Sequence, residues 1–251
     1  MPEPAAAADA IRRVALVTGG ARRLGAALAR GLAARGYDLL VHHGASASEA
    51  QTLAQELMAA HGGRVAIVQA DLQDEGAPTQ VVSAAMQAFG RLDVVVSSAS
   101  IMEPRAFGEV TVDDWERAQS VNLRAPFFLL QAAAQVMAEG GVFVQLADHL
   151  AYETGWSSLL PHQVTKAALT QLVRAGAETL APRVRVNAIA PGLVLAPAHF
   201  GEAATTRFLR DVPMGRVGTP DDVAQALHFL IDATYVTGVV LPVDGGRHLR
   251  R

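Results

Sequence analysis

Cysteine is absent from this 251-residue chain, and its absence excludes disulfide bonds and thiolate metal sites. We therefore expect no metal centre of the zinc-ribbon or iron–sulfur kind, and we assign no metal ligands. A chain without cysteine also suits a reducing compartment, which leads us to expect a cytoplasmic protein.

Long runs of positive charge and of apolar residues are missing as well. The 21 basic and 24 acidic residues give a net charge of -3 without a basic stretch that could follow a phosphate backbone, so we expect no nucleic-acid partner. The most apolar stretch, residues 125–138, is too short to span a bilayer and is interrupted by Gln131 and Gln135. The first residues lack the apolar core of a secretory signal, and we expect no membrane partner.

Short β-branched runs alternate with longer alanine-rich segments, which is typical of parallel strands joined by crossover helices. The chain is long enough for one large domain and does not need a second. We expect an α/β fold with a single-domain, Rossmann-type, doubly wound parallel sheet of about seven strands and helices on both faces. The expected strands are residues 14–18, 38–42, 64–70, 92–97, 141–146, 183–189 and 239–243. The expected helices are residues 24–35, 48–61, 78–89, 112–138, 163–181 and 220–231.

Two segments stand outside this alternation. Residues 1–11 are typical of a flexible tail, which leaves residues 12–251 as a single domain. Residues 191–216 are the one long irregular stretch inside the chain, and we expect a substrate loop there that acts as a lid. Farther along, Pro220 and the two aspartates that follow it indicate the first turn of the last helix.

A glycine-rich turn directly follows the first expected strand and opens the first expected helix. It has the sequence Thr-Gly-Gly-Ala-Arg-Arg-Leu-Gly from residue 18 to residue 25. A helix N-terminus in this context supplies free N–H groups to a pyrophosphate, and Gly19 and Gly25 allow the backbone to approach that group. The alternative is a tight strand-to-helix turn without a ligand.

The residues beside this turn favour NADP(H) over NAD(H). Arg22 and Arg23 lie inside the turn. The second expected strand ends with His42 and His43, where an NAD-binding protein usually has an acidic residue. The missing carboxylate removes a repulsion of the 2′-phosphate, and Ser46 adds a hydroxyl donor. The alternative for one of the two histidines is a polar strand end that faces solvent.

The order of motifs resembles that of short-chain dehydrogenases/reductases over essentially the whole chain, from residue 14 to residue 250. The motifs that carry the resemblance are the glycine turn, Asp71-Leu72, Asn122, the Lys166 segment, Pro191-Gly192 and Val236-Thr237-Gly238. Within that family, Arg23 and the C-terminal residues 244–250 are similar to the pteridine reductase and dihydromonapterin reductase branch.

The resemblance implies roles for several of these residues. Asp71 would bind the adenine amino group, Leu72 would pack beside it, and Pro191-Gly192 would border the nicotinamide. Each also has a structural explanation, since Asp71 can cap a turn and Pro191-Gly192 can end a strand. The residues expected to bind NADP(H) are Gly19, Arg22, Arg23, Leu24, Gly25, His43, Ser46, Asp71, Leu72, Ser98, Ala99, Lys166, Pro191 and Gly192.

The segment after the fourth expected strand departs from the family pattern. The family has Asn-Asn-Ala-Gly or Asn-Asn-Ala-Ser, whereas this chain has serines at residues 97, 98 and 100 around Ala99. Serine has a shorter reach and one donor instead of two, which lowers the expected cofactor affinity. The pteridine branch stacks its substrate on an aromatic ring where this chain has Met102, which offers a smaller stacking surface. The expected substrate contacts are Ser100, Met102 and Leu193.

The chemical centre departs further. The family donates a proton from the tyrosine of Tyr-x-x-x-Lys, and here Lys166 is present but the tyrosine position is His162. A phenol becomes more acidic beside an ammonium group, whereas an imidazole is driven towards its neutral form, which is a poor acid. A neutral imidazole can still polarise a carbonyl through its N–H group or relay a proton from a neighbour.

The family's serine, or aspartate in the pteridine branch, lies thirteen positions before the tyrosine. In this chain that position falls on His149, next to Asp148. We favour Asp148 as the matching acid, which implies one inserted residue between residues 150 and 161, and we expect Asp148 and His162 to form a proton relay. The alternative is that both are polar residues at a strand end. Asn122 would maintain a helix kink and a water that feeds Lys166, or else is a polar residue of an amphipathic helix.

Two functions from different classes remain open. The first is an NADPH-dependent reductase of a small carbonyl or imine substrate, with a dihydropterin as one candidate and with Asn122, Asp148, His162 and Lys166 as the catalytic residues. The second is a catalytically impaired relative that binds NADP(H) or another ligand. The family resemblance also implies a homotetramer, packed through the expected helices 112–138 and 163–181.

Overall fold

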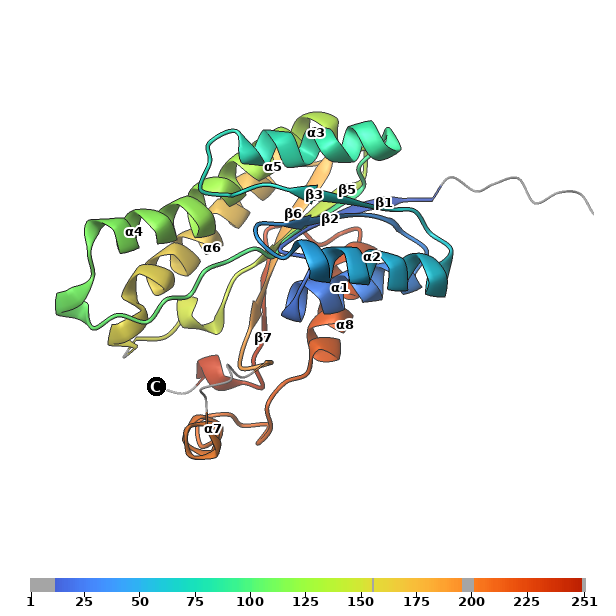
Figure 1. The fold of residues 1–251 in the computed structure, drawn as a ribbon. Helices are drawn as coiled ribbons and strands as arrows, with labels where there is room; N and C mark the ends of the chain where they lie inside the picture. Colours follow the sequence, from blue (N-terminus) through green and yellow to red (C-terminus); the bar gives the residue numbers. More distant parts are fainter. Residues whose placement is uncertain (1–11, 155, 196–200, 250–251) are drawn as a thin grey trace, which may run out of the picture.

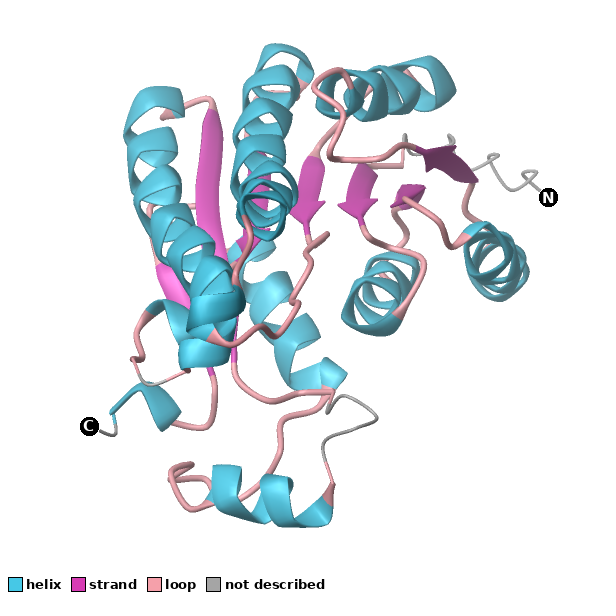
Figure 2. Cartoon of the chain, turned by 60° about the vertical axis from the view of Figure 1, so that its left-hand side comes forward, coloured by secondary structure: helices cyan, strands magenta, loops and turns pink. Residues whose placement is uncertain are grey.

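The computed structural model describes residues 12–154, 156–195 and 201–249. In this part of the chain a seven-stranded sheet has the order β3-β2-β1-β4-β5-β6-β7, and all neighbouring strands are parallel. The strands are β1 (Val14–Thr18), β2 (Asp38–His43), β3 (Val65–Gln69), β4 (Val94–Ser97), β5 (Gly141–Leu146), β6 (Val184–Pro191) and β7 (Val240–Val243). Figures 1 and 2 show this sheet between two layers of helices. The expected doubly wound α/β fold is confirmed.

The central strands are buried on both faces, which explains their nearly continuous apolar sequence. Because successive side chains of a strand point to opposite faces, Ala15 and Val17 of β1 join one hydrophobic core, whereas Val14 and Leu16 join the other. The first core is covered by α1 (Arg23–Ala34), α2 (Ala47–His61) and α8 (Pro220–Asp232). The second is covered by α3 (Ala77–Phe89), α5 (Ala125–Val136) and α6 (Leu160–Leu180).

The strand order reverses next to β1, whose neighbours are β2 on one side and β4 on the other. In the register, Thr18 of β1 pairs with Ser97 of β4, and Ser97 pairs with Gln145 of β5. The carboxyl ends of these three strands are therefore level with one another. A crevice at such a reversal point is where doubly wound sheets bind their ligands.

The prediction of a single helix over residues 112–138 is wrong in the middle of this range. The structure has α4 (Val112–Gln119), a π-helical turn (Ser120–Arg124) and then α5. The N–H of Ala125 reaches the carbonyl of Ser120, five residues back. Pro126 has no N–H to donate to residue 122, so the regular hydrogen-bond ladder is interrupted at Asn122.

The segment from 191 to 216 is not irregular throughout. It contains α7 (Glu202–Leu209), which lies away from the main body and close to the C-terminal turn in Figure 1. Residues 196–200 of the expected loop and the expected tail at 1–11 lie outside the described residues. The helix expected from residue 163 begins earlier, at Leu160, since Pro161 suits a first turn.

The last helix begins where the sequence predicts. Thr219 accepts a hydrogen bond from the N–H of Asp222, whose side chain in turn accepts from Thr219. Over the described part of the chain, no helix has both the length and the apolar character needed to cross a membrane.

Candidate functional site

A cavity of about 1060 Å³ lies along the carboxyl edge of the sheet. Its wall is made by the turn after β1, the residues that follow β2 to β6, the start of α6 and one side of α7. Every sequence-predicted site residue lines this one cavity except Asn122, which lies behind its wall. Residues that are far apart in the chain thus meet in a single site.

The glycine turn forms one end of the cavity. Gly19 has φ of 61°, and a Cβ on it would lie 2.9 Å from the Cα of Ala99. A Cβ on Gly25 would lie only 2.2 Å from the carbonyl oxygen of Gly19, so this position accepts no side chain. Because Gly25 lies in the first turn of α1, the N-terminus of that helix faces the cavity without an intervening side chain.

His42 supports this turn from below, a role that the sequence analysis missed. Its Nδ1 accepts from the N–H of Gly19 at 3.2 Å, and its Nε2–H donates to the carbonyl of Ala70 at 3.0 Å. Burial lowers the pKa of His42, which keeps the ring neutral and able to play both parts. The alternative that one histidine of the pair faces solvent is wrong, because His42 and His43 are 2% and 4% exposed.

The corner beyond β2 collects polar groups. The Nδ1 atom of His43 is buried without a hydrogen-bond partner and its side chain lines the cavity. Arg22 is well exposed and has one weak ion pair, 3.7 Å from Glu49. Arg23 is held differently, since its Nη2 donates to the carbonyl of Leu195 at 2.7 Å. Ser46, buried at the start of α2, completes this corner.

The backbone after β4 is held by a residue that the sequence analysis did not select. The Oγ1 of Thr18 accepts from the N–H groups of Ser98 and Ala99, at 3.0 and 3.2 Å. Asp71 accepts from the N–H of Gln73 at 2.9 Å and so stabilises its own turn while it lines the cavity. Both the structural and the binding explanation of Asp71 therefore remain compatible with its geometry.

Lys166 is buried in the wall of the cavity. Its Nζ donates to the carbonyl of Leu146 at 2.9 Å, and its side chain is 3% exposed. Burial lowers the pKa of Lys166 to about 8, although the charge of Asp148 opposes this effect. An ammonium group with a single protein acceptor has two N–H groups left for a ligand.

His162 lies one helical turn before Lys166, and both of its ring nitrogens have partners. Nδ1 is 2.9 Å from the carbonyl oxygen of Ile101, and Nε2 is 3.3 Å from Oδ2 of Asp148. A carbonyl oxygen only accepts, so Nδ1 carries a proton. Towards an ionised Asp148, the second contact is a hydrogen bond only when Nε2 carries a proton too.

Asn122 fixes the acceptor of that first hydrogen bond. Its Oδ1 accepts from the N–H of Ile101 at 2.8 Å, and its Nδ2 donates to the Ile101 carbonyl at 2.9 Å. Oδ1 also accepts from the hydroxyl of Ser100 at 3.1 Å. The π-helical turn that presents Asn122 thus holds the segment after β4 against α6.

Asp148, and not His149, faces His162. Burial alone would raise the pKa of Asp148, but hydrogen bonds from His149 and His162 outweigh burial and hold that pKa well below its usual range. The N–H of Leu150 also donates to Asp148 at 2.9 Å. The carboxylate is therefore ionised and fixed in orientation.

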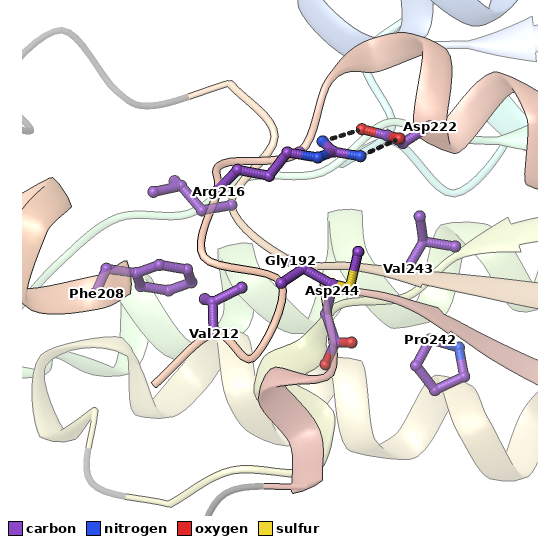
Figure 3. A pocket seen from close by; sticks show the side chains of 12 residues that line it. Gly192, Phe208, Val212, Arg216, Asp222, Pro242, Val243 and Asp244 are labelled. Atoms are coloured by element: carbon purple, nitrogen blue, oxygen red, sulfur yellow. Dashed lines mark hydrogen bonds and ion pairs between the residues drawn. The ribbon is translucent and has the colours of Figure 1, made fainter. Parts of the chain in front are cut away.

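The far end of the cavity is largely apolar. Trp156 and Phe208 line it together with Met102 and Leu193, and Met102 is 45% exposed. Behind Phe208 a separate cavity of about 140 Å³ lies between α7 and the end of β7, closed on one side by the Arg216–Asp222 ion pair (Figure 3). Phe208 contributes to both cavities and separates them.

Comparison with known proteins gives consistent matches over nearly the whole chain. A family model described as Enoyl-(Acyl carrier protein) reductase matches residues 19–248. Short-chain dehydrogenase/reductase FrzI of Cladobotryum sp is 34% identical over 247 residues, which cover 93% of this chain and 95% of FrzI.

Two solved structures that resemble this one contain a nicotinamide dinucleotide. A blue fluorescent protein from a metagenomic library, in complex with NADPH, is 37% identical with a TM-score of 0.89, over 94% of this chain and 97% of that one. A short chain dehydrogenase from Burkholderia cenocepacia J2315, in complex with NADP, is 33% identical with a TM-score of 0.89, over 94% and 98%.

Proposed function

This chain belongs to the short-chain dehydrogenase/reductase family, and we propose that it is an NADPH-dependent reductase of a small carbonyl or imine substrate. One observation carries the proposal. A single cavity joins the bare N-terminus of α1 to the Lys166, His162 and Asp148 side chains, so that a dinucleotide bound at one end reaches a proton source at the other.

The residues present fit NADP(H). The side-chain-free approach between Gly19 and Gly25 suits a pyrophosphate, and the unpartnered Nδ1 of His43 is available to a ligand beside Arg22 and Ser46. β2 ends in His43 and not in an acidic residue that would repel a 2′-phosphate. NADPH and NADP in two structural relatives support the same assignment.

Other cavity residues would hold the remaining parts of the dinucleotide. Asp71 and Leu72 would contact the adenine, Lys166 the ribose hydroxyls next to the nicotinamide, and Pro191 with Gly192 the nicotinamide ring. A Cβ on Gly192 would lie 2.8 Å from the Cα of Asp244, so this part of the wall has a fixed shape.

When bound, the cofactor supplies a hydride to the substrate carbon. His162 would supply the proton: when Nε2, 3.3 Å from Asp148, carries a proton, that proton would transfer to the oxygen or nitrogen atom that becomes negative. The carbonyl of Ile101 keeps Nδ1 protonated throughout, so Nε2 is the atom that gains and loses the proton.

The test is the consumption of NADPH by the purified protein with a panel of ketones, aldehydes, quinones and cyclic imines. Stoichiometric substrate reduction that falls strongly in Lys166→Ala supports the reductase. Turnover that survives Lys166→Ala unchanged contradicts the role of Lys166 in holding the cofactor. Thr170→Ala is a matched control, since Thr170 lies one turn farther along α6 and donates to the carbonyl of Ala167 within the helix.

The second candidate is a catalytically impaired relative that binds NADP(H) as a sensor or partner protein. The histidine at position 162 in place of the family's tyrosine favours this candidate. Tight NADPH binding without turnover on the whole panel would support it. A sharp gain of activity in His162→Tyr would then identify His162 as the inactivating residue.

A dihydropterin is the candidate substrate within the reductase proposal. The similarity of Arg23, Asp148 and the C-terminal segment to the pteridine reductase branch supports it, whereas the exposed Met102 offers no ring to stack against a pterin. A kcat/KM for dihydropterins above that for simple cyclic ketones would support this substrate, and the reverse order would exclude it.

We further propose that the protein acts as a homotetramer in the cytoplasm. Trp115 of α4, Phe127 and Phe128 of α5 and Val164 of α6 leave large apolar side chains 37% to 45% exposed on neighbouring helices. Such side chains suit contact with a second copy of the chain. Light scattering on purified protein tests the assembly, and a mass near that of one chain, 26.3 kDa, would contradict it.

A further inference from the structure

Asp148 is held by a second histidine that the proposed mechanism does not use. His149 directs Nδ1 at Oδ1 of Asp148, 2.9 Å away, and at the carbonyl oxygen of Pro191, 3.2 Å away. Both partners accept, so Nδ1 carries a proton. The ring is 8% exposed, and it lies beside the cavity between β5 and β6.

The two oxygens of Asp148 are thereby given different tasks. Oδ1 accepts from the N–H of Leu150 at 2.9 Å, and Nδ1 of His149 lies at the same distance from it. Oδ2 is left for His162. Rotation of the carboxylate would give up the Leu150 hydrogen bond and the close contact with His149.

The other groups that face His149 keep this arrangement in place. Its Nε2 lies 3.8 Å from Oε1 of Glu153, and the ring packs edge-on against Phe208 of α7 with 5.7 Å between the centroids. Glu153 is in turn held by Arg247 of the C-terminal turn through two hydrogen bonds of 2.8 and 3.1 Å. Lys166 is the remaining charged group that interacts with Asp148.

Acidic and basic side chains alternate from the cavity to the C-terminal turn. Burial would lower the pKa of His149, but the hydrogen bond to Asp148 and the charges of Asp148 and Glu153 outweigh burial and raise it. His149 thus lies behind Asp148 with its Nδ1–H on the side of the carboxylate, and Glu153 and Arg247 lie behind His149.

We propose that His149 is a positioning residue that sets the proton affinity of the Asp148–His162 pair. This proposal rests on the proposed function, because it takes the Asp148–His162 pair as the proton donor of the reaction. By withdrawing charge from Oδ1, His149 weakens the hold of the carboxylate on the proton at Nε2 of His162, so that this proton passes more readily to a substrate.

Removal of the donor has a definite sign. Without an N–H at position 149, Oδ1 keeps only the Leu150 bond, and the carboxylate attracts the shared proton more strongly. The midpoint at which the pair releases this proton then moves to higher pH, by about one unit. If His149 had only a structural role, its replacement would change the stability of the protein. The midpoint would then not depend on whether residue 149 has an N–H donor.

The experiment follows the ring of His162 by NMR of protein labelled with ¹³C at histidine Cε1, with His162→Gln used to assign its signal. His149→Phe removes the donor and keeps a ring against Phe208, and His149→Asn keeps an N–H donor. We expect the midpoint to rise by about one pH unit in His149→Phe and by less than half as much in His149→Asn. His228→Phe, on α8 and outside the cavity, is the matched control and should leave it unchanged.

Equal midpoints in wild type, His149→Phe and His149→Asn would overturn the proposal, as would equal shifts in both variants. His149→Leu replaces the phenylalanine variant if that variant does not fold. The measurement needs neither cofactor nor substrate. A protein that fails to oxidise NADPH but shows the expected order of midpoints would therefore refute the proposed function and leave the role of His149 standing.

Discussion

The two ends of the cavity are built in different ways. The end that we propose to bind the cofactor, called the cofactor end, is made mainly of backbone, with the N-terminus of α1 exposed between Gly19 and Gly25 and the N–H groups of Ser98 and Ala99 held by one threonine. The chemical end is made of side chains that contact one another over long separations in sequence, such as His162 with Ile101. A backbone site depends on a few residues without side chains, whereas a side-chain site depends on each member of its network.

The sharpest test of the backbone end is Gly25→Ala. A Cβ there meets the carbonyl oxygen of Gly19 at 2.2 Å, so the turn must open and the helix N-terminus moves away from the pyrophosphate. We expect NADPH affinity to fall by at least about 100-fold, measured by calorimetry. Gly76→Ala is the matched control, since nothing lies within 4 Å of a Cβ added at Gly76 and the φ of this residue is -79°. Unchanged NADPH affinity in Gly25→Ala would contradict the difference between the two ends of the cavity.

The next largest effect belongs to the chemical end. His162→Phe keeps an aromatic ring but removes the Nε2 proton and should lower kcat by about 100-fold, the usual worth of a general acid. NADPH affinity should change little, because His162 is not among the residues that we propose to bind the cofactor. Single-turnover kinetics measures both quantities, and a variant with the wild-type kcat would show that the proton comes from elsewhere.

Lys166→Met separates stability from function within the chemical end. Burial lowers the pKa of Lys166 from 10.5 to about 8, so the charged form costs folding free energy at neutral pH. We expect the variant to be more stable at pH 7 by about 3 kcal/mol, yet far less active. Between pH 8 and 10.5 the unfolded chain holds a proton that the folded protein has lost, so this gain should shrink as the pH rises. Urea unfolding at several pH values measures it, and a less stable variant contradicts the burial argument.

The smallest effect is expected at the exposed corner of the backbone end. Arg22 has only a 3.7 Å ion pair with Glu49, so it is available to a 2′-phosphate. Arg22→Ala should reduce the preference for NADPH over NADH by about tenfold, through weaker NADPH binding alone. Arg30→Ala, which removes a surface arginine paired with Glu56, is the control. Equal losses for both cofactors in Arg22→Ala would remove the 2′-phosphate assignment.

The cofactor end could be predicted from the sequence because its information is local. The strand before Gly19 and the helix after it lie next to the turn in the chain, and periodicity locates both. The fold followed from the same alternation of strands and helices. His42 was misread because its ring is buried by residues from another strand, which no local pattern shows.

The chemical end could be predicted only in part. The residue types of His162 and Lys166 pointed to it, but the choice between Asp148 and His149 depended on which side chain turns towards α6. Likewise, the π-helical turn at Asn122 follows from a proline four residues later. The hydrogen bonds between Asn122 and Ile101 join residues that are 21 positions apart in the sequence. Helix α7 was missed because its short apolar face packs against the C-terminal turn and the cavity, which are distant in sequence.

The central claim is that this cavity binds NADPH at its backbone end in a position to react at its side-chain end. Calorimetric titration of the purified protein with NADPH and with NADH, at about pH 6 and about pH 8, tests it most directly. We expect the protein to bind NADPH at both pH values with a clear preference over NADH. Failure to bind either dinucleotide would contradict it and leave a Rossmann-type scaffold with another ligand.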